Sequence, residues 1–265
     1  MIVTCLSASA APGVSTTALM LALHNTAPRS LLIEADPIGS SPTLAGYLQG
    51  QIRHDRSVVN LVTPHTHGQL DSAFDRQLVP LTDNSRVRLL PGLVHTRQTR
   101  TVSGLWSPLA DLLGGQSTQG AAIVIDAGRV GHTAFARDLV TRSDLVLLVQ
   151  RPTRVAVAAA RSSLPILRAQ LEQSRSRAPI GLVVVGDKPY TAKEVASVLQ
   201  LPLAMTIPDD AKGARQYSEG IHLAGFSKAR SPLLQSTSKL WPTVNTFVDT
   251  HKPDWLTTDS EKGTQ

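Results

Sequence analysis

The chain has 265 residues, of which 42% are apolar and 4% aromatic, and it carries a formal net charge of +6 and one cysteine. This length suits a single large α/β domain with an aliphatic core, and the lone cysteine excludes an internal disulfide framework. No apolar run is long enough to span a membrane and the N-terminus lacks a signal-peptide pattern, so we expect a cytoplasmic protein, whose basic balance permits contact with nucleic acid or an anionic membrane surface.

Short apolar runs alternate with helical patterns along the chain. We expect strands at 2–6, 30–34, 86–90, 121–126, 145–149, 180–185 and 203–205. Helices are expected at 16–25, 105–113, 133–142, 153–173, 191–199 and 209–218. Strands that are apolar throughout and alternate with helices are typical of parallel sheets covered on both faces. The sequence therefore predicts a mostly parallel, doubly wound α/β sheet flanked by helices.

Two segments lie outside this alternation of strands and helices. Residues 51–85 have no clear periodicity, and we expect short helices and loops there. Residues 233–248 predict a final helix with one apolar face, which we expect to pack against the domain. The alternative is a membrane-contacting helix, but the stretch lacks the basic polar face of such helices. We thus expect one domain over residues 1–250 and a polar, disordered tail over 251–265.

The segment between the first expected strand and the first expected helix reads Ala10-Ala11-Pro12-Gly13-Val14-Ser15-Thr16-Thr17. A loop in this position presents backbone N–H groups and a helix N-terminus, which together bind phosphate. The pattern of a phosphate-binding loop is G-x-x-x-x-G-K-S/T. Here Ala10 and Ser15 replace the glycines and Thr16 replaces the lysine, while Thr17 keeps the hydroxyl that binds magnesium. We expect nucleotide to be held by Pro12, Gly13, Val14, Ser15, Thr16 and Thr17.

Two aspartates lie at the ends of expected strands. Asp36 belongs to Glu34-Ala35-Asp36-Pro37-Ile38-Gly39, and Asp126 closes the run that begins at Ala121. Ligands of open parallel sheets bind beyond the carboxyl ends of the strands. We expect Asp36 to act in catalysis by orienting an attacking water, and Asp126 to hold magnesium together with Thr17. The alternative is that both aspartates merely cap the helices that follow them.

This combination resembles the ParA/MinD family of deviant-Walker ATPases, whose loop reads K-G-G-V-G-K-T-T and whose second motif reads D-x-D-P-x-G. Residues 34–39 match the second motif, with Glu34 in place of its first aspartate. The run Ile123-Val124-Ile125-Asp126 matches the Walker B strand. Segments 143–149, 201–203 and 207–210, with Gly220, resemble later parts of the family, so the likeness covers most of residues 1–230. It implies a P-loop NTPase fold, ATP and Mg²⁺ as cofactors, and a homodimer.

The chain is similar in particular to an actinobacterial-type subgroup whose loop reads like G-S-P-G-V-T-T-T and whose sixth strand ends like V-G-D-x-P-Y. The corresponding residues are Ala11-Pro12-Gly13-Val14-Ser15-Thr16-Thr17 and Val185-Gly186-Asp187-Lys188-Pro189-Tyr190. This resemblance implies a Tad/CpaE-like positioning protein that works beside a pilus or secretion assembly.

The chain departs from the family at its lysines. One family lysine contacts the nucleotide phosphates and the other, at the position of Ala11, reaches across a nucleotide-sandwich dimer; both are absent. Each loss removes a charge-assisted contact of about 1.5–3 kcal/mol, so we expect weak ATP binding and weak or absent hydrolysis. Arg129 offers a substitute cation, and a solvated loop arginine is the alternative.

Three functions follow from these observations. The first is a positioning or recruitment factor that binds a protein partner. The second is an active partitioning ATPase that binds DNA non-specifically through basic residues of its C-terminal third. The third is a nucleotide-free adaptor, in which the loop only connects a strand to a helix.

Overall fold

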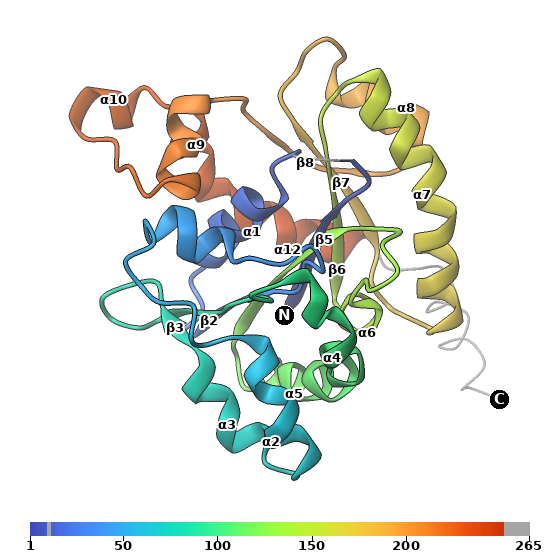
Figure 1. Cartoon of the computed structure of the whole chain (residues 1–265). Helices are drawn as coiled ribbons and strands as arrows, with labels where there is room; N and C mark the ends of the chain where they lie inside the picture. Colours follow the sequence, from blue (N-terminus) through green and yellow to red (C-terminus); the bar gives the residue numbers. More distant parts are fainter. Residues whose placement is uncertain (10–11, 252–265) are drawn as a thin grey trace, which may run out of the picture.

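The computed structural model describes residues 1–9 and 12–251, which fold around one central eight-stranded sheet (Figure 1). Its strands are β1 (Ile2–Ser7), β2 (Ser30–Glu34), β3 (Val79–Pro80), β4 (Val87–Leu90), β5 (Ala122–Arg129), β6 (Leu145–Gln150), β7 (Ile180–Val185) and β8 (Leu203–Ile207). Their order across the sheet is β3-β4-β2-β5-β1-β6-β7-β8. Neighbouring strands are parallel, except that β3 runs antiparallel to β4.

Helices cover both faces of the sheet (Figure 1). They are α1 (Val14–Leu23), α2 (Val62–Thr66), α3 (Leu70–Gln77), α4 (Thr99–Val102), α5 (Trp106–Thr118), α6 (Arg137–Thr141), α7 (Arg154–Gln173), α8 (Ala192–Leu199), α9 (Ala211–Ser218), α10 (Gly225–Ala229), α11 (Pro232–Ser236) and α12 (Leu240–Thr250). Side chains of α5, α6, α7 and α8 join one buried cluster, and those of α1, α9, α11 and α12 join another on the opposite face.

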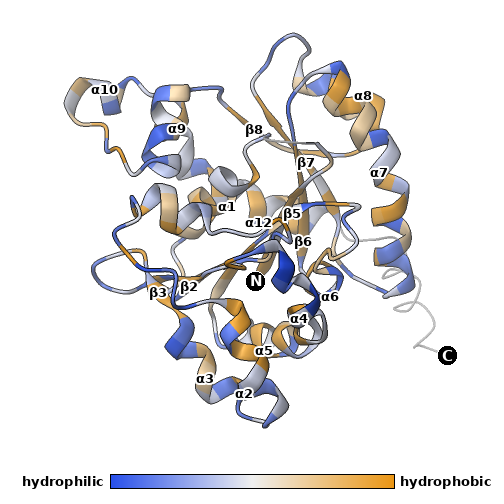
Figure 2. Cartoon of the chain, in the orientation of Figure 1, coloured by the Kyte–Doolittle hydropathy of each residue, from blue (hydrophilic) through white to orange (hydrophobic). Residues whose placement is uncertain are grey.

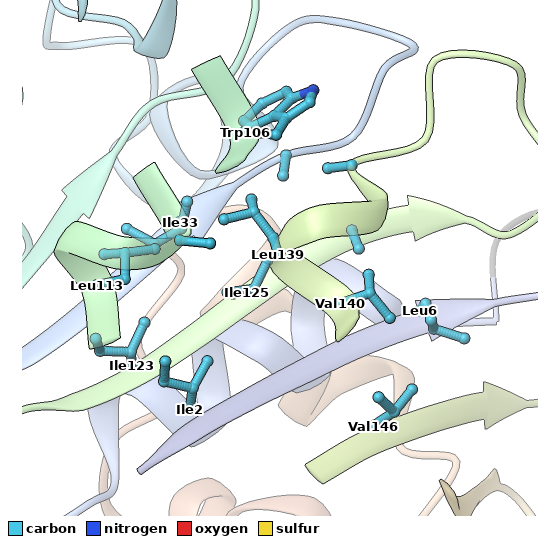
Figure 3. Close-up of a cluster of buried hydrophobic side chains, with 14 of the residues drawn as sticks. Ile2, Leu6, Ile33, Trp106, Leu113, Ile123, Ile125, Leu139, Val140 and Val146 are labelled. Carbon is cyan, nitrogen blue, oxygen red and sulfur yellow. The ribbon is translucent and has the colours of Figure 1, made fainter. Parts of the chain in front are cut away.

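The strands are apolar throughout because both of their faces are buried. In β1, Ile2 and Leu6 belong to one cluster, whereas Val3 and Cys5 belong to the other. Figure 3 shows the first cluster, which combines strand residues with helix residues: Ile2, Ile33, Ile123, Ile125 and Val146 from strands, and Trp106, Leu113, Leu139 and Val140 from helices. Hydrophobic colouring accordingly follows the central strands, whereas α7 and α8 carry both hydrophobic and hydrophilic residues (Figure 2).

The predicted mostly parallel, doubly wound sheet is confirmed, with local corrections. Helix α1 begins at Val14, two residues before the expected start. The helix expected over 133–142 is confined to Arg137–Thr141, because residues 131–136 form turns. Residues 51–85 contain the expected short helices, a 3₁₀ turn and α2 and α3, but also the edge strand β3.

The C-terminal helix packs against the domain, as its apolar face predicts. Trp241 of α12 is buried, and its Nε1 donates a hydrogen bond of 2.7 Å to the carbonyl oxygen of Leu21 in α1. None of the helices within residues 1–9 and 12–251 has the length and hydropathy needed to cross a membrane. The tail expected over 251–265 lies, apart from His251, outside the described residues.

Candidate functional site

The predicted site residues come together at the carboxyl ends of three adjacent strands. In the sheet, β5 lies between β1 and β2, with Cys5 and Glu34 both in register with Asp126. The segments that follow these strands surround a cavity of about 310 Å³. Its walls are formed by Ser7, Ser9, Pro12, Gly13, Val14, Ser15, Thr16, Asp36, Ile38, Asp126, Gly128 and Arg129. A cavity of this size lies at the lower end of the range for small-ligand sites.

The loop before α1 has the backbone geometry of an anion site. Gly13 has a φ of 101°, in the left-handed region that glycine tolerates best. It is the N-cap of α1, and no side chain among the described residues caps this helix. The first N–H groups of α1 therefore lack side-chain partners, and the helix dipole adds partial positive charge at this end. Because Gly13, Ser15 and Thr16 all line the cavity, an anion there meets the helix N-terminus.

Asp126 is buried at the floor of the site, with 2% of its surface exposed. It accepts a 3.1 Å hydrogen bond from the backbone N–H of Gly128, and the Ser15 hydroxyl also bonds to it. Burial, together with the charges of Glu34 and Asp36, raises the pKa of Asp126 from 3.8 to about 7, against the opposing effect of the two hydrogen bonds. A bound divalent cation favours the ionised carboxylate, which is the form that coordinates magnesium.

Asp36 packs directly against the segment that follows Asp126. A β carbon on residue 128 would lie 2.6 Å from each carboxylate oxygen of Asp36, so this contact requires glycine at that position. The same carboxylate accepts a 2.9 Å hydrogen bond from the N–H of Ile38. Neither Asp36 nor Asp126 is an N-cap, because Pro42 and Ala136 occupy those positions in the helical segments that follow. The helix-capping alternative is therefore wrong for both aspartates.

Glu34 holds the segment that carries Asp36. Its carboxylate is 3% exposed and accepts backbone N–H bonds of 3.0 Å from Thr43 and 3.1 Å from Gly92. Burial raises the pKa of Glu34, while these bonds and those from the hydroxyls of Ser41 and Thr43 lower it. The side chain thus ties the chain after β2 to the chain after β4. No role of its own was predicted for Glu34, although its position two residues before Asp36 in the motif indicates one.

Thr17, predicted to bind magnesium, lies inside the fold. It is 2% exposed and does not line the cavity, and its N–H donates a 2.9 Å bond to the carbonyl oxygen of Gly13. Its metal-binding role stays a prediction, whereas Ser15 contacts the Asp126 carboxylate. Ala10 and Ala11, the positions of the first glycine and the dimer-crossing lysine, lie outside the described residues.

The donor set fits magnesium that arrives with a phosphate ligand. Within the described ranges, no group of three histidine, cysteine or acidic side chains forms a metal cage. Magnesium, however, keeps several waters and commonly binds one or two carboxylates together with substrate phosphates. Asp126 and Asp36, which line the same cavity as the N-terminus of α1, supply that arrangement.

No protein-family model matches the sequence, and no curated protein matches it. Solved structures do match the fold. A ParA family ATPase from Chlorobium tepidum TLS superposes with a TM-score of 0.72 at 16% identity, covering 90% of this chain and 97% of that one. A putative plasmid partition protein from Borrelia burgdorferi B31 bound to AMPPNP gives 0.67 at 17% identity, covering 92% and 98%. The MinC:MinD cell division protein complex of Aquifex aeolicus gives 0.65 at 16% identity, covering 92% and 95%.

The chain therefore has the fold of ParA/MinD-type P-loop NTPases over almost its whole length. At these identities the likeness establishes the fold alone, so the chemistry rests on the residues of this cavity.

Proposed function

We propose that the chain is a ParA/MinD-like nucleotide-binding protein that positions or recruits a protein partner and hydrolyses ATP weakly or not at all. The observation that carries this proposal is a phosphate-binding loop that lacks its lysine and lines one cavity together with two carboxylates. The backbone around Gly13 and the N-terminus of α1 would hold phosphate, Asp126 would hold magnesium, and Asp36 would orient an attacking water.

Weak chemistry follows from the missing charge. Phosphoryl transfer depends mainly on electrostatic stabilisation of the transferring group, and a loop lysine is a principal source of that stabilisation. Thr16 occupies the lysine position and carries no charge. Backbone N–H groups and magnesium remain available to bind the phosphates, so nucleotide binding is retained better than ATP hydrolysis.

The partner assignment rests on resemblance. The solved relatives include one bound to AMPPNP and one in a complex of MinC with MinD, which supports nucleotide binding and a protein partner for this chain as well. The loop Pro12-Gly13-Val14-Ser15-Thr16-Thr17 and the segment Val185–Tyr190 support a Tad/CpaE-like role beside a pilus or secretion assembly. We further propose that the chain forms a homodimer around nucleotide.

The test is calorimetric titration with ATP and ADP, with and without magnesium, followed by turnover and light-scattering measurements. We expect binding, slow or absent phosphate release, and a nucleotide-dependent dimer. Brisk hydrolysis that Asp36→Ala abolishes would instead establish an active ATPase. Absence of thermal stabilisation by millimolar Mg-ATP would establish the nucleotide-free adaptor, because a ligand of the native state raises its stability.

A partitioning ATPase that binds DNA is the second candidate, supported by several exposed cations. Lys212 of α9, Lys228 of α10, Arg230 and Lys239 are all exposed in the C-terminal third. Their charge suits phosphate backbones without sequence preference. This candidate predicts retention on DNA with ATP at low salt, falling steeply as salt rises. No retention at 50 mM salt would exclude it.

A further inference from the structure

The cavity contains one unexplained charge. Among the described residues that line it, Arg129 is the only cationic side chain, and it shares the cavity with the carboxylates of Asp36 and Asp126 and the N-terminus of α1. Arg129 is exposed, and no ion pair within residues 1–9 and 12–251 engages it. A polyphosphate in this cavity meets two acidic groups, so a cation is needed to balance them.

A bulge in the sheet turns Arg129 toward the site. In the ladder of β1 and β5, Cys5 pairs with Asp126 and Ser7 pairs with Arg129, so two steps along β1 correspond to three along β5. Strand residues three positions apart normally point to opposite faces. The extra residue cancels this alternation, which brings Arg129 to the same side as Asp126. The backbone there is fixed, because the N–H of Val130 donates a 2.8 Å bond to the carbonyl oxygen of Ser7.

We propose that Arg129 supplies the cation that the phosphate-binding loop lacks and contacts the terminal phosphate of a bound nucleoside triphosphate. This inference rests on the proposed function. The planar guanidinium donates paired hydrogen bonds to phosphate oxygens and stays charged at all physiological pH values.

The position of Arg129 predicts which phosphate it contacts. Arg129 lies three residues after Asp126 at the carboxyl end of β5, beside the end of β1 that leads into the loop. In P-loops the backbone N–H groups hold the α- and β-phosphates, whereas the lysine reaches the β- and γ-phosphates. A cation that takes the place of the lysine therefore acts mainly on the γ-phosphate. Loss of Arg129 is expected to weaken ATP binding more than ADP binding.

The experiment compares magnesium-dependent ATP and ADP affinities of the full chain with those of Arg129→Ala and Arg129→Lys. The matched control is Arg161→Ala, another exposed arginine, on α7. We expect Arg129→Ala to lose ATP affinity by about 10- to 100-fold, ADP affinity by only a few-fold, and Arg129→Lys to lie between. The control should match the unmodified chain, and unchanged thermal unfolding without nucleotide shows that the variants fold.

A rescue variant separates charge from shape. Thr16→Lys restores the usual loop lysine. When it is combined with Arg129→Ala, we expect the double variant to regain ATP affinity. The proposal is overturned if Arg129→Ala binds ATP as tightly as the unmodified chain, or if neither Arg129→Lys nor Thr16→Lys recovers any affinity. If the unmodified chain binds neither ATP nor ADP at millimolar concentration, the proposed function itself fails. If the unmodified chain and Arg129→Ala bind ATP equally well, the proposed function stands and only the role of Arg129 is excluded.

Discussion

The carboxylate of Asp36 occupies the space that a side chain at Gly128 would need. A β carbon on residue 128 would lie 2.6 Å from both Asp36 oxygens, and Gly128 has a φ of 64° in the left-handed region. The contact joins the segment after β2 to the carboxyl end of β5, which are the two carboxylate-bearing walls of the cavity. The spacing of these two walls therefore depends on the absence of a β carbon at residue 128.

Replacing Gly128 tests this dependence. We expect Gly128→Ala to lower the free energy of unfolding by about 1–3 kcal/mol, since alanine is strained at this φ and clashes with Asp36. Urea unfolding measures the change. Gly115→Ala is the matched control, because Gly115 lies in α5 and no atom of the described residues comes within 4 Å of its added β carbon. This change should stabilise the protein by about 0.5–1 kcal/mol. Equal effects of the two changes would contradict the packing argument.

The buried carboxyl of Asp126 makes stability depend on pH. Its native pKa of about 7 lies above its ordinary value of 3.8, so the native state binds more protons than the unfolded state between these limits. Stability therefore falls as pH rises from about 4 to 7 and stays low above that range. We expect Asp126→Asn to remove the Asp126 part of this slope, leaving the smaller part due to the raised pKa of Glu34, and to stabilise the magnesium-free protein at pH 8 by on the order of 2–4 kcal/mol.

Urea unfolding from pH 4 to 8 measures the Asp126 effect. Asp187→Asn is the control, because Asp187 is exposed in the segment after β7, and we expect it to leave stability unchanged. If the stability of Asp126→Asn falls as steeply over this range as that of the unmodified chain, Asp126 is excluded as a source of the slope.

Glu34 is expected to hold the Asp36 segment in place. In Glu34→Gln an amide NH₂ faces one of the two N–H donors, from Thr43 or Gly92, leaving that donor without an acceptor. We expect a loss of about 1–3 kcal/mol and faster hydrogen exchange at the unpaired amide. Glu172→Gln, an exposed change on α7, should alter neither quantity. Unchanged exchange at both amides would argue against the tie.

Trp241 is expected to anchor the C-terminal helix. Trp241→Phe keeps an aromatic ring but removes the Nε1 donor to Leu21, and we expect a loss of about 1–2 kcal/mol in urea unfolding. Trp106→Phe makes the same change in the opposite cluster, where the side chain donates no hydrogen bond to the described residues. A loss no larger than that of Trp106→Phe would show that the Trp241 bond adds no stability.

The sequence predicted every strand except β3, because each of the other seven is a continuous apolar run. Burial on both faces of the sheet requires that composition. Strand β3 was missed because it has only two residues, one of them an exposed proline, and it exists through pairing with β4. Helix boundaries were displaced where turns rather than periodicity decide them, as before Arg137.

At the site, residue types at strand ends predicted that the loop, Asp36 and Asp126 would meet. The roles of Glu34 and Gly128, and the contact of Ser15 with Asp126, depend on which loops pack together in three dimensions. The bulge that turns Arg129 toward the cavity is likewise a property of strand pairing, and no spacing along the chain encodes it.

The chain also carries its own reporter of large-scale opening. Its single cysteine, Cys5, is fully buried in β1 between β5 and β6, and burial raises the pKa of its thiol. A thiol-reactive dye reaches it only when the centre of the sheet separates. When the sheet recloses faster than the dye reacts, the labelling rate therefore measures the free energy of that opening in the unaltered protein. Slower labelling with added nucleotide would measure how much a ligand at the carboxyl ends of the strands stabilises the whole fold.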